Sequence, residues 1–92
     1  MKAPPIEPLS LRRRGKGEYS FVSTIARDIA QARFPHTKYP RIFVIWKDLA
    51  VKNYSSDWWI MSPENERLGT ASTLRDTKRF LGNYLCDIGW LR

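Results

Sequence analysis

Lysine and arginine are the residues of this chain whose spacing most clearly suggests chemistry. Near the N-terminus, four cations occur within five residues: Arg12, Arg13, Arg14 and Lys16. A second cluster shares one flank of a predicted helix and consists of Arg75, Lys78 and Arg79. Guanidinium groups suit bidentate contacts with phosphate, so both clusters are candidate contacts to a nucleic-acid backbone. Gly82 falls on the same flank as the second cluster, where a missing side chain would let a phosphate approach closely.

The net charge points to the same class of partner. The 92 residues include 16 Lys plus Arg against 9 Asp plus Glu, which gives a formal net charge of +7 at pH 7. Such an excess attracts polyanions, and nucleic acid is the most common of them. Two alternatives stay open: the charge serves only solubility, or it attracts an anionic lipid surface. The lipid alternative is weakened because no amphipathic basic helix is predicted at a terminus.

Tryptophan is frequent for so short a chain, with four residues. Trp58 and Trp59 are adjacent, and adjacent residues of a β-strand point to opposite faces of the sheet. One of the two is therefore expected on an open face, where it would stack on a base or anchor a protein partner. Three cations are candidates to share that face: Lys47, Lys52 and Arg67. The alternative is that the N-terminal arm or residues 49–54 cover this tryptophan.

Evidence for an enzyme is weak, and we predict a binding protein. His36 is the single histidine, and a lone histidine needs a positioned partner to act as a general base; a surface position is the simpler interpretation. Cys86 lies beside the apolar stripe of the predicted C-terminal helix, which favours a small buried hydrophobic residue over a nucleophile. The carboxylates are scattered and no phosphate-binding glycine loop occurs, so the sequence predicts neither a metal nor a cofactor.

The cysteine content and the length of the apolar runs indicate the cellular compartment in which the protein is expected. One cysteine allows no intrachain disulfide, which suits a reducing environment. The longest uninterrupted apolar run, Ile42 to Trp46, is far too short to span a bilayer. The N-terminal residues contain no apolar stretch of signal-peptide length. We therefore expect a cytoplasmic protein that does not associate with a membrane.

Prolines and glycines distinguish an N-terminal arm from the rest of the chain. Residues 1–18 contain three prolines, two glycines and the first cationic cluster, and they are predicted to form a flexible basic arm. From Phe21 to Phe34, apolar residues recur every three or four positions, which predicts an amphipathic helix. Ser20 is the expected N-cap, and Pro35 ends the helix because the residue before proline avoids helical dihedrals.

Three strands are predicted in the middle of the chain. Residues 41–47 contain an apolar run that is rich in β-branched and aromatic side chains, as expected for a central strand covered on both faces. Residues 49–54 fit a continuation of that strand, an edge strand or a loop. Residues 57–62 and 67–71 enclose a Pro-Glu-Asn-Glu segment at residues 63–66, whose turn chemistry predicts a β-hairpin.

A second helix completes the expected fold. Thr73 and Asp76 have the spacing of a reciprocal N-terminal cap, and Gly89 is placed to end the helix. The fold class is therefore α+β: a three-stranded antiparallel sheet with two helices on one face, in the order α-β-β-β-α, preceded by the basic arm. Residues 19–92 are expected to form one domain. This order resembles that of double-stranded RNA binding domains and of some small ribonuclease toxins, in topology alone.

The sequence thus predicts a small nucleic-acid-binding protein, with DNA favoured over RNA, that contacts phosphates through the two cationic clusters. Its size and charge fit an accessory or regulatory factor of a phage or mobile element. One alternative is a protein-interaction module or inhibitor, anchored by Trp58 or Trp59 and directed by charge to an acidic partner surface. Another alternative is a small ribonuclease toxin that uses His36. Oligomeric state and sequence specificity are left open.

Overall fold

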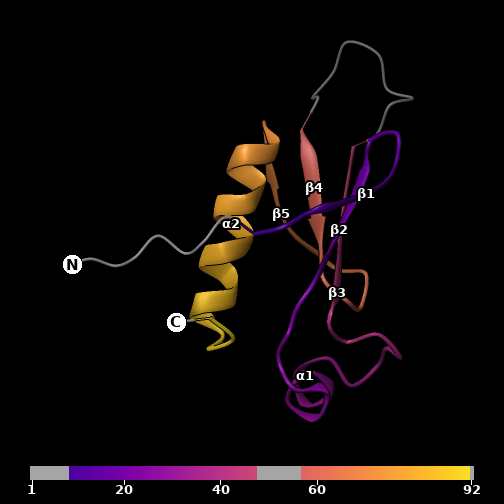
Figure 1. Ribbon diagram of the computed structural model, residues 1–92, viewed down its shortest axis with the longest axis vertical. Coiled ribbons are helices and arrows are strands. Elements are labelled where there is room, and N and C mark those ends of the chain that lie inside the picture. The colour runs from indigo at the N-terminus through magenta and orange to yellow at the C-terminus, as the bar shows by residue number, and fades with distance from the viewer. Residues whose placement is uncertain (1–8, 48–56, 92) are drawn as a thin grey trace, which may run out of the picture.

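The fold is built on a five-stranded antiparallel sheet with one long helix packed against it (Figure 1). The computed structural model describes residues 9–47 and 57–91. Its elements follow in the order β1 (Arg12–Gly15), β2 (Glu18–Val22), α1 (Arg27–Arg33), β3 (Ile42–Lys47), β4 (Trp58–Met61), β5 (Arg67–Ala71) and α2 (Leu74–Asp87). Each strand pairs with its neighbours in the chain, so the strand order in the sheet is β1-β2-β3-β4-β5.

The central strand and the C-terminal hairpin occupy the segments that the sequence predicts. β3, β4 and β5 lie within residues 41–47, 57–62 and 67–71. In the turn between β4 and β5, Asn65 has a φ of 64°, a left-handed conformation that asparagine tolerates. The hydroxyl of Ser62 accepts hydrogen bonds from two backbone amides of the same turn at 3.1 Å. These elements of the prediction are confirmed.

The predicted three-stranded sheet is wrong, because residues 12–22 add two strands to it. Tyr19 and Phe21 alternate with Ser20 and Val22, and this period of two belongs to a strand. β2 pairs along its whole length with β3, and β1 pairs with β2. The order α-β-β-β-α is therefore replaced by β-β-α-β-β-β-α, and the topological resemblance to double-stranded RNA binding domains and ribonuclease toxins no longer applies.

The arginine-rich segment is an edge strand and not part of a flexible arm. Its pairing with β2 includes an irregularity between Arg13 and Gly15, and Gly17 makes the turn with a φ of 71°. The preceding residue Leu9 is buried in the core. Residues 1–8 of the predicted arm and the ambiguous residues 49–54 lie outside the described residues.

α1 is shorter than predicted and lies beyond the end of the sheet, so the two helices do not share a sheet face (Figure 1). Phe21 and Val22, taken as the first turn of the helix, belong to β2. Within α1 the one buried residue is Ala30, and Ile29 is 50% exposed. The apolar stripe is therefore too narrow to pack on a sheet. The contact with the core comes from Ala30 and from Phe34, the residue that follows the helix.

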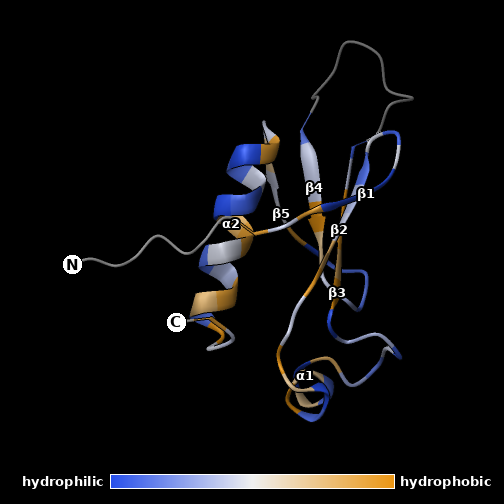
Figure 2. Ribbon diagram, in the orientation of Figure 1, coloured by the Kyte–Doolittle hydropathy of each residue, from blue (hydrophilic) through white to orange (hydrophobic). Residues whose placement is uncertain are grey.

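α2 begins and ends where the sequence predicts. The hydroxyl of Thr73 accepts a hydrogen bond from the backbone amide of Asp76 at 3.0 Å, which satisfies a donor that the first helical turn leaves unpaired. Gly89 follows the last turn with a φ of 82°, the left-handed conformation that ends many helices. Hydrophilic residues gather in the N-terminal half of α2 and hydrophobic residues in its C-terminal half (Figure 2).

The core lies between α2 and one face of the sheet. Its centre consists of apolar side chains without solvent exposure: Phe43, Ile45, Ile60, Leu81 and Leu85. Phe34 and Trp90 pack edge-on against the ring of Phe43, at 5.9 and 6.0 Å between centroids. The fully buried Thr77 donates its hydroxyl proton to the carbonyl oxygen of Thr73 at 2.9 Å. Burial of apolar area, about 25 cal/mol per Å², therefore stabilises this fold without a disulfide.

β5 and α2 approach each other closely at Gly69. A β-carbon added at this position would lie 2.5 Å from Cζ of Phe80, well inside van der Waals contact. Gly15 in β1 has open space at the corresponding position. Alanine substitutions at the two glycines therefore separate the effect of close packing from the general effect of replacing a glycine.

We predict that Gly69→Ala lowers the free energy of unfolding by about 1–3 kcal/mol, because the ring of Phe80 must leave its packed position. Gly15→Ala should leave it unchanged or raise it by up to about 1 kcal/mol, because alanine restricts the unfolded chain. Urea unfolding followed by tryptophan fluorescence measures both variants. Equal stabilities would contradict the close contact between β5 and α2.

Candidate functional site

The register of the strands assigns the sheet residues to two faces. Directly paired residues share a face, so Ile45 and Ile60 both point toward α2 and the core. Trp46 pairs with Trp59 on the other face. None of the described helices packs over this second face (Figure 1), which we call the open face. Its members are Arg12, Glu18, Ser20, Val22, Ile42, Val44, Trp46, Trp59, Met61, Arg67 and Thr70.

A stack of aromatic rings and a guanidinium group lies on β3, β4 and β5 of the open face. The ring centroids of Trp46 and Trp59 lie 5.0 Å apart, with 30° between the ring planes. The guanidinium carbon of Arg67 lies 4.6 Å from the centroid of Trp59, a distance at which a cation is attracted by the face of the ring. Both tryptophans are partly exposed and Arg67 is exposed. The three side chains therefore form a partly accessible stacking surface, which we call the tryptophan stack.

Cations also mark both edges of the open face. One row of paired residues crosses all five strands in the order Arg12, Ser20, Val44, Met61, Arg67. Arg12 lies in the edge strand β1 and Arg67 in the edge strand β5; between them, Ser20 and Met61 are buried and Val44 is partly exposed. Glu18, which pairs with Trp46, is an acidic residue on this face.

Trp58 lies on the opposite face from Trp59, as strand geometry requires. Its ring packs edge-on against Tyr19, 5.6 Å between centroids, and the ammonium nitrogen of Lys47 lies 5.3 Å from its ring centroid. Trp58 packs against the hydrophobic core, whereas Trp46 and Trp59 do not. Of the three cations considered as companions of the exposed tryptophan, Arg67 shares its face, Lys47 does not, and Lys52 lies outside the described residues.

The two cationic clusters predicted to bind nucleic acid lie on elements that do not touch. Arg12, Arg13, Arg14 and Lys16 are exposed on β1 and its turn. Arg75 and Arg79 are exposed and Lys78 is partly buried on α2, which packs over β4 and β5 and makes no contact with β1. Because β1 is the opposite edge strand, the structure does not join the clusters into one surface.

Gly82 does not open the helix to phosphates, contrary to expectation. The residue is buried, as are Leu81 and Leu85 on the same helix. Gly82 shares the helix flank of Arg75 and Lys78, but its burial leaves no accessible backbone there for a phosphate to approach.

The remaining candidate residues gain few partners in the described part of the chain. His36 is exposed, and its backbone amide donates a hydrogen bond to Oε2 of Glu64 at 2.7 Å. This bond ties the loop after α1 to the turn between β4 and β5, and involves the backbone instead of the imidazole. Cys86 is partly buried on α2. Within residues 9–47 and 57–91, His, Cys, Asp and Glu form no group of three that would hold a metal ion.

Trp46 is the member of the tryptophan stack that the sequence did not reveal. It belongs to an apolar run expected to be covered on both faces, and only the pairing of β3 with β4 places it beside Trp59. The local signal was present, since Trp46 alternates with the buried Ile45, but the register depends on contacts distant in the sequence.

Comparisons with models of protein families, with curated proteins and with solved structures find no match for this chain. None of the helices described is long and apolar enough to cross a membrane. The function must therefore be argued from the open face and its surroundings.

We predict that Trp58→Ala lowers the free energy of unfolding by about 3 kcal/mol, since it removes a ring packed on the core. Trp59→Ala should cost only about 1 kcal/mol, the loss of one ring pair and one cation–π contact. Chemical unfolding followed by circular dichroism measures both losses. If the two variants were equally destabilised, Trp59 would be a core residue and not part of an accessible face.

Proposed function

We propose that this protein binds single-stranded nucleic acid on the open face of its sheet. The observation that carries the proposal is the tryptophan stack, formed by Trp46, Trp59 and Arg67 on a face that the described helices leave uncovered. Aromatic rings and guanidinium planes stack on any base, and each stacked base contributes about 1–3 kcal/mol to binding. The arrangement therefore suits sequence-tolerant recognition of bases.

A single strand fits this surface better than a duplex does. The bases of a duplex are stacked on one another, and only unpaired bases can be splayed onto an aromatic side chain. The tryptophan stack lies on a sheet face and not on a helix or loop that projects into a groove. Stacking and phosphate contact do not distinguish deoxyribose from ribose, so the expected preference for DNA stays a prediction.

The charges of the open face complement a nucleic-acid strand. Arg12 and Arg67 lie at its two edges, and Arg14 and Lys16 are exposed further along β1 and its turn, whereas Arg13 pairs with Tyr19 of the other face. Phosphates would contact these edges while bases contact the tryptophan stack. Each phosphate neutralised on a single strand adds about 0.7 to the slope of log affinity against log salt concentration. Affinity should therefore fall steeply with salt.

We predict that oligonucleotides of about ten nucleotides quench the tryptophan fluorescence of the full chain, with micromolar or tighter binding of single-stranded DNA or RNA at about 50 mM salt. Binding should be much weaker at about 200 mM salt and weaker for the duplex. Trp59→Ala should reduce the affinity roughly tenfold, because one stacking partner is lost. Binding of the single strand no tighter than that of polyglutamate would contradict the proposal and favour a protein partner with an acidic surface.

Two charge-matched double variants locate the binding surface. Arg12→Ala with Arg67→Ala removes two cations from the open face, whereas Arg75→Ala with Arg79→Ala removes two from α2. The first pair should weaken binding at least fivefold more than the second, because the net charge changes equally and only the first removes contacts. The reverse order would show that the cations of α2 form the binding surface instead.

A further inference from the structure

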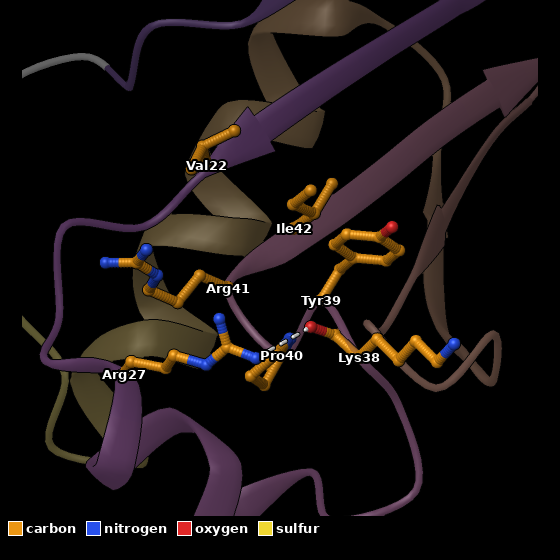
Figure 3. Close-up of a pocket in the computed structure, with 7 residues that line it drawn as sticks. All are labelled: Val22, Arg27, Lys38, Tyr39, Pro40, Arg41 and Ile42. Carbon is orange, nitrogen blue, oxygen red and sulfur yellow. Dashed lines mark hydrogen bonds between the residues drawn. The ribbon is translucent and has the colours of Figure 1, made fainter.

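A shallow pocket lies at the end of the open face, beside α1 (Figure 3). Its volume is about 100 Å³, and three cationic residues line it: Arg27, Lys38 and Arg41. Its remaining lining is apolar or aromatic, and no carboxylate lines it. The guanidinium groups of Arg27 and Arg41 repel each other beside this small depression unless an anion neutralises them. The composition of the pocket therefore points to an anionic ligand.

The two guanidinium groups keep most of their donors available. Arg27 donates from Nη2 to the backbone oxygen of Lys38, and Arg41 donates from Nη1 to the backbone oxygen of Ile25, both at 3.4 Å. A guanidinium carries five N–H donors, so four on each side chain remain for a ligand. Both guanidinium groups lie on the same side of the pocket, whereas the ammonium group of Lys38 points away from them (Figure 3). Arginine forks of this kind bind phosphate oxygens in pairs.

One aromatic and two aliphatic side chains also line the pocket (Figure 3). Tyr39 is 65% exposed and Val22 is 55% exposed, and both line the pocket together with Ile42. The Tyr39 ring makes no ring contact with another aromatic residue among those described. An exposed tyrosine ring offers a flat apolar surface on which a ligand can stack. A ligand that fits both the guanidinium groups and these apolar side chains carries an anion joined to a flat or apolar group.

We propose that this pocket binds a nucleotide phosphate, with Arg27 and Arg41 on the phosphate oxygens and Tyr39 against the attached base or sugar. The inference rests on the proposed function, because Val22 and Ile42 belong to both the pocket and the open face. Ile42 lies four residues before Trp46 on β3, a distance of about 13 Å. A strand stacked on Trp46 and Trp59 can therefore continue into the pocket. The phosphate is either one inside the strand or one at its end.

The test is a titration of the uniformly ¹⁵N-labelled full chain with adenosine monophosphate, adenosine, inorganic phosphate and succinate in turn. Adenosine monophosphate should shift the amide signals of residues 38–42 and bind at least fivefold more tightly than each other probe. Arg27→Ala should weaken this binding at least fivefold. Arg33→Ala, which removes an exposed cation from the other end of α1, should leave it unchanged. Tyr39→Ala should weaken it several-fold, and Tyr39→Phe should retain it.

Each other result overturns a defined part of the inference. Equal binding of inorganic phosphate would show that the Tyr39 ring contributes nothing, and equal binding of succinate would show a general anion site. Absence of shifts at residues 38–42 would remove the pocket altogether. The proposed function is tested by a separate experiment, in which oligonucleotides quench tryptophan fluorescence and Trp59→Ala weakens their binding. Its failure can therefore be distinguished from failure of the pocket. A strand with a 5′-phosphate that shifts residues 38–42 more than the same strand without one identifies a terminal phosphate; equal shifts identify an internal one.

Discussion

The pairing of β3 with β4 is the interaction on which both faces of the sheet depend. With Ile45 opposite Ile60, two fully buried side chains meet beneath α2, and Trp46 then lies opposite Trp59 on the other side. Side chains alternate with a period of two, so a shift of one residue would turn the tryptophans into the core and the isoleucines toward solvent. Burial of the isoleucines therefore positions the tryptophan stack, and one register sets both the core and the candidate site.

A single helix cannot cover one face of five strands, so α2 covers part of that face and other side chains cover the rest. α2 packs over β4 and β5, while the part of the core beneath β2 and β3 is closed by Phe34 and Trp90, which follow α1 and α2. This explains why α1 needs only Ala30 as a buried contact. An antiparallel sheet can leave one face without a second layer. Here that face keeps two tryptophans, which are costly to expose unless they have a partner.

The C-terminal half could be predicted from the sequence because its signals are local. The cap at Thr73, the left-handed Gly89 and the turn at residues 63–66 depend on contacts within a few residues. β1 and β2 depend instead on pairing with β3, and Phe21 and Val22 fit the start of a helix as well as the end of a strand. The candidate site likewise depends on contacts between segments that are distant in the sequence. Strand alternation separates Trp58 from Trp59 within one segment, whereas the partner of Trp59 and the pocket cations come from separate segments.

The distribution of charge and aromatic surface is the reason for proposing a single nucleic-acid strand, and not a duplex or an acidic protein, as the ligand. The aromatic surface lies on β3 and β4 of the open face, and arginines lie at the edges of that face and in the pocket at its end. A duplex presents phosphates but hides the faces of its bases. An acidic protein surface presents charge without a series of flat rings. The net charge of +7 attracts all of these ligands. In the proposed complex, contact with the tryptophan stack would discriminate between them, because only an unpaired strand offers bases and phosphates at the same time.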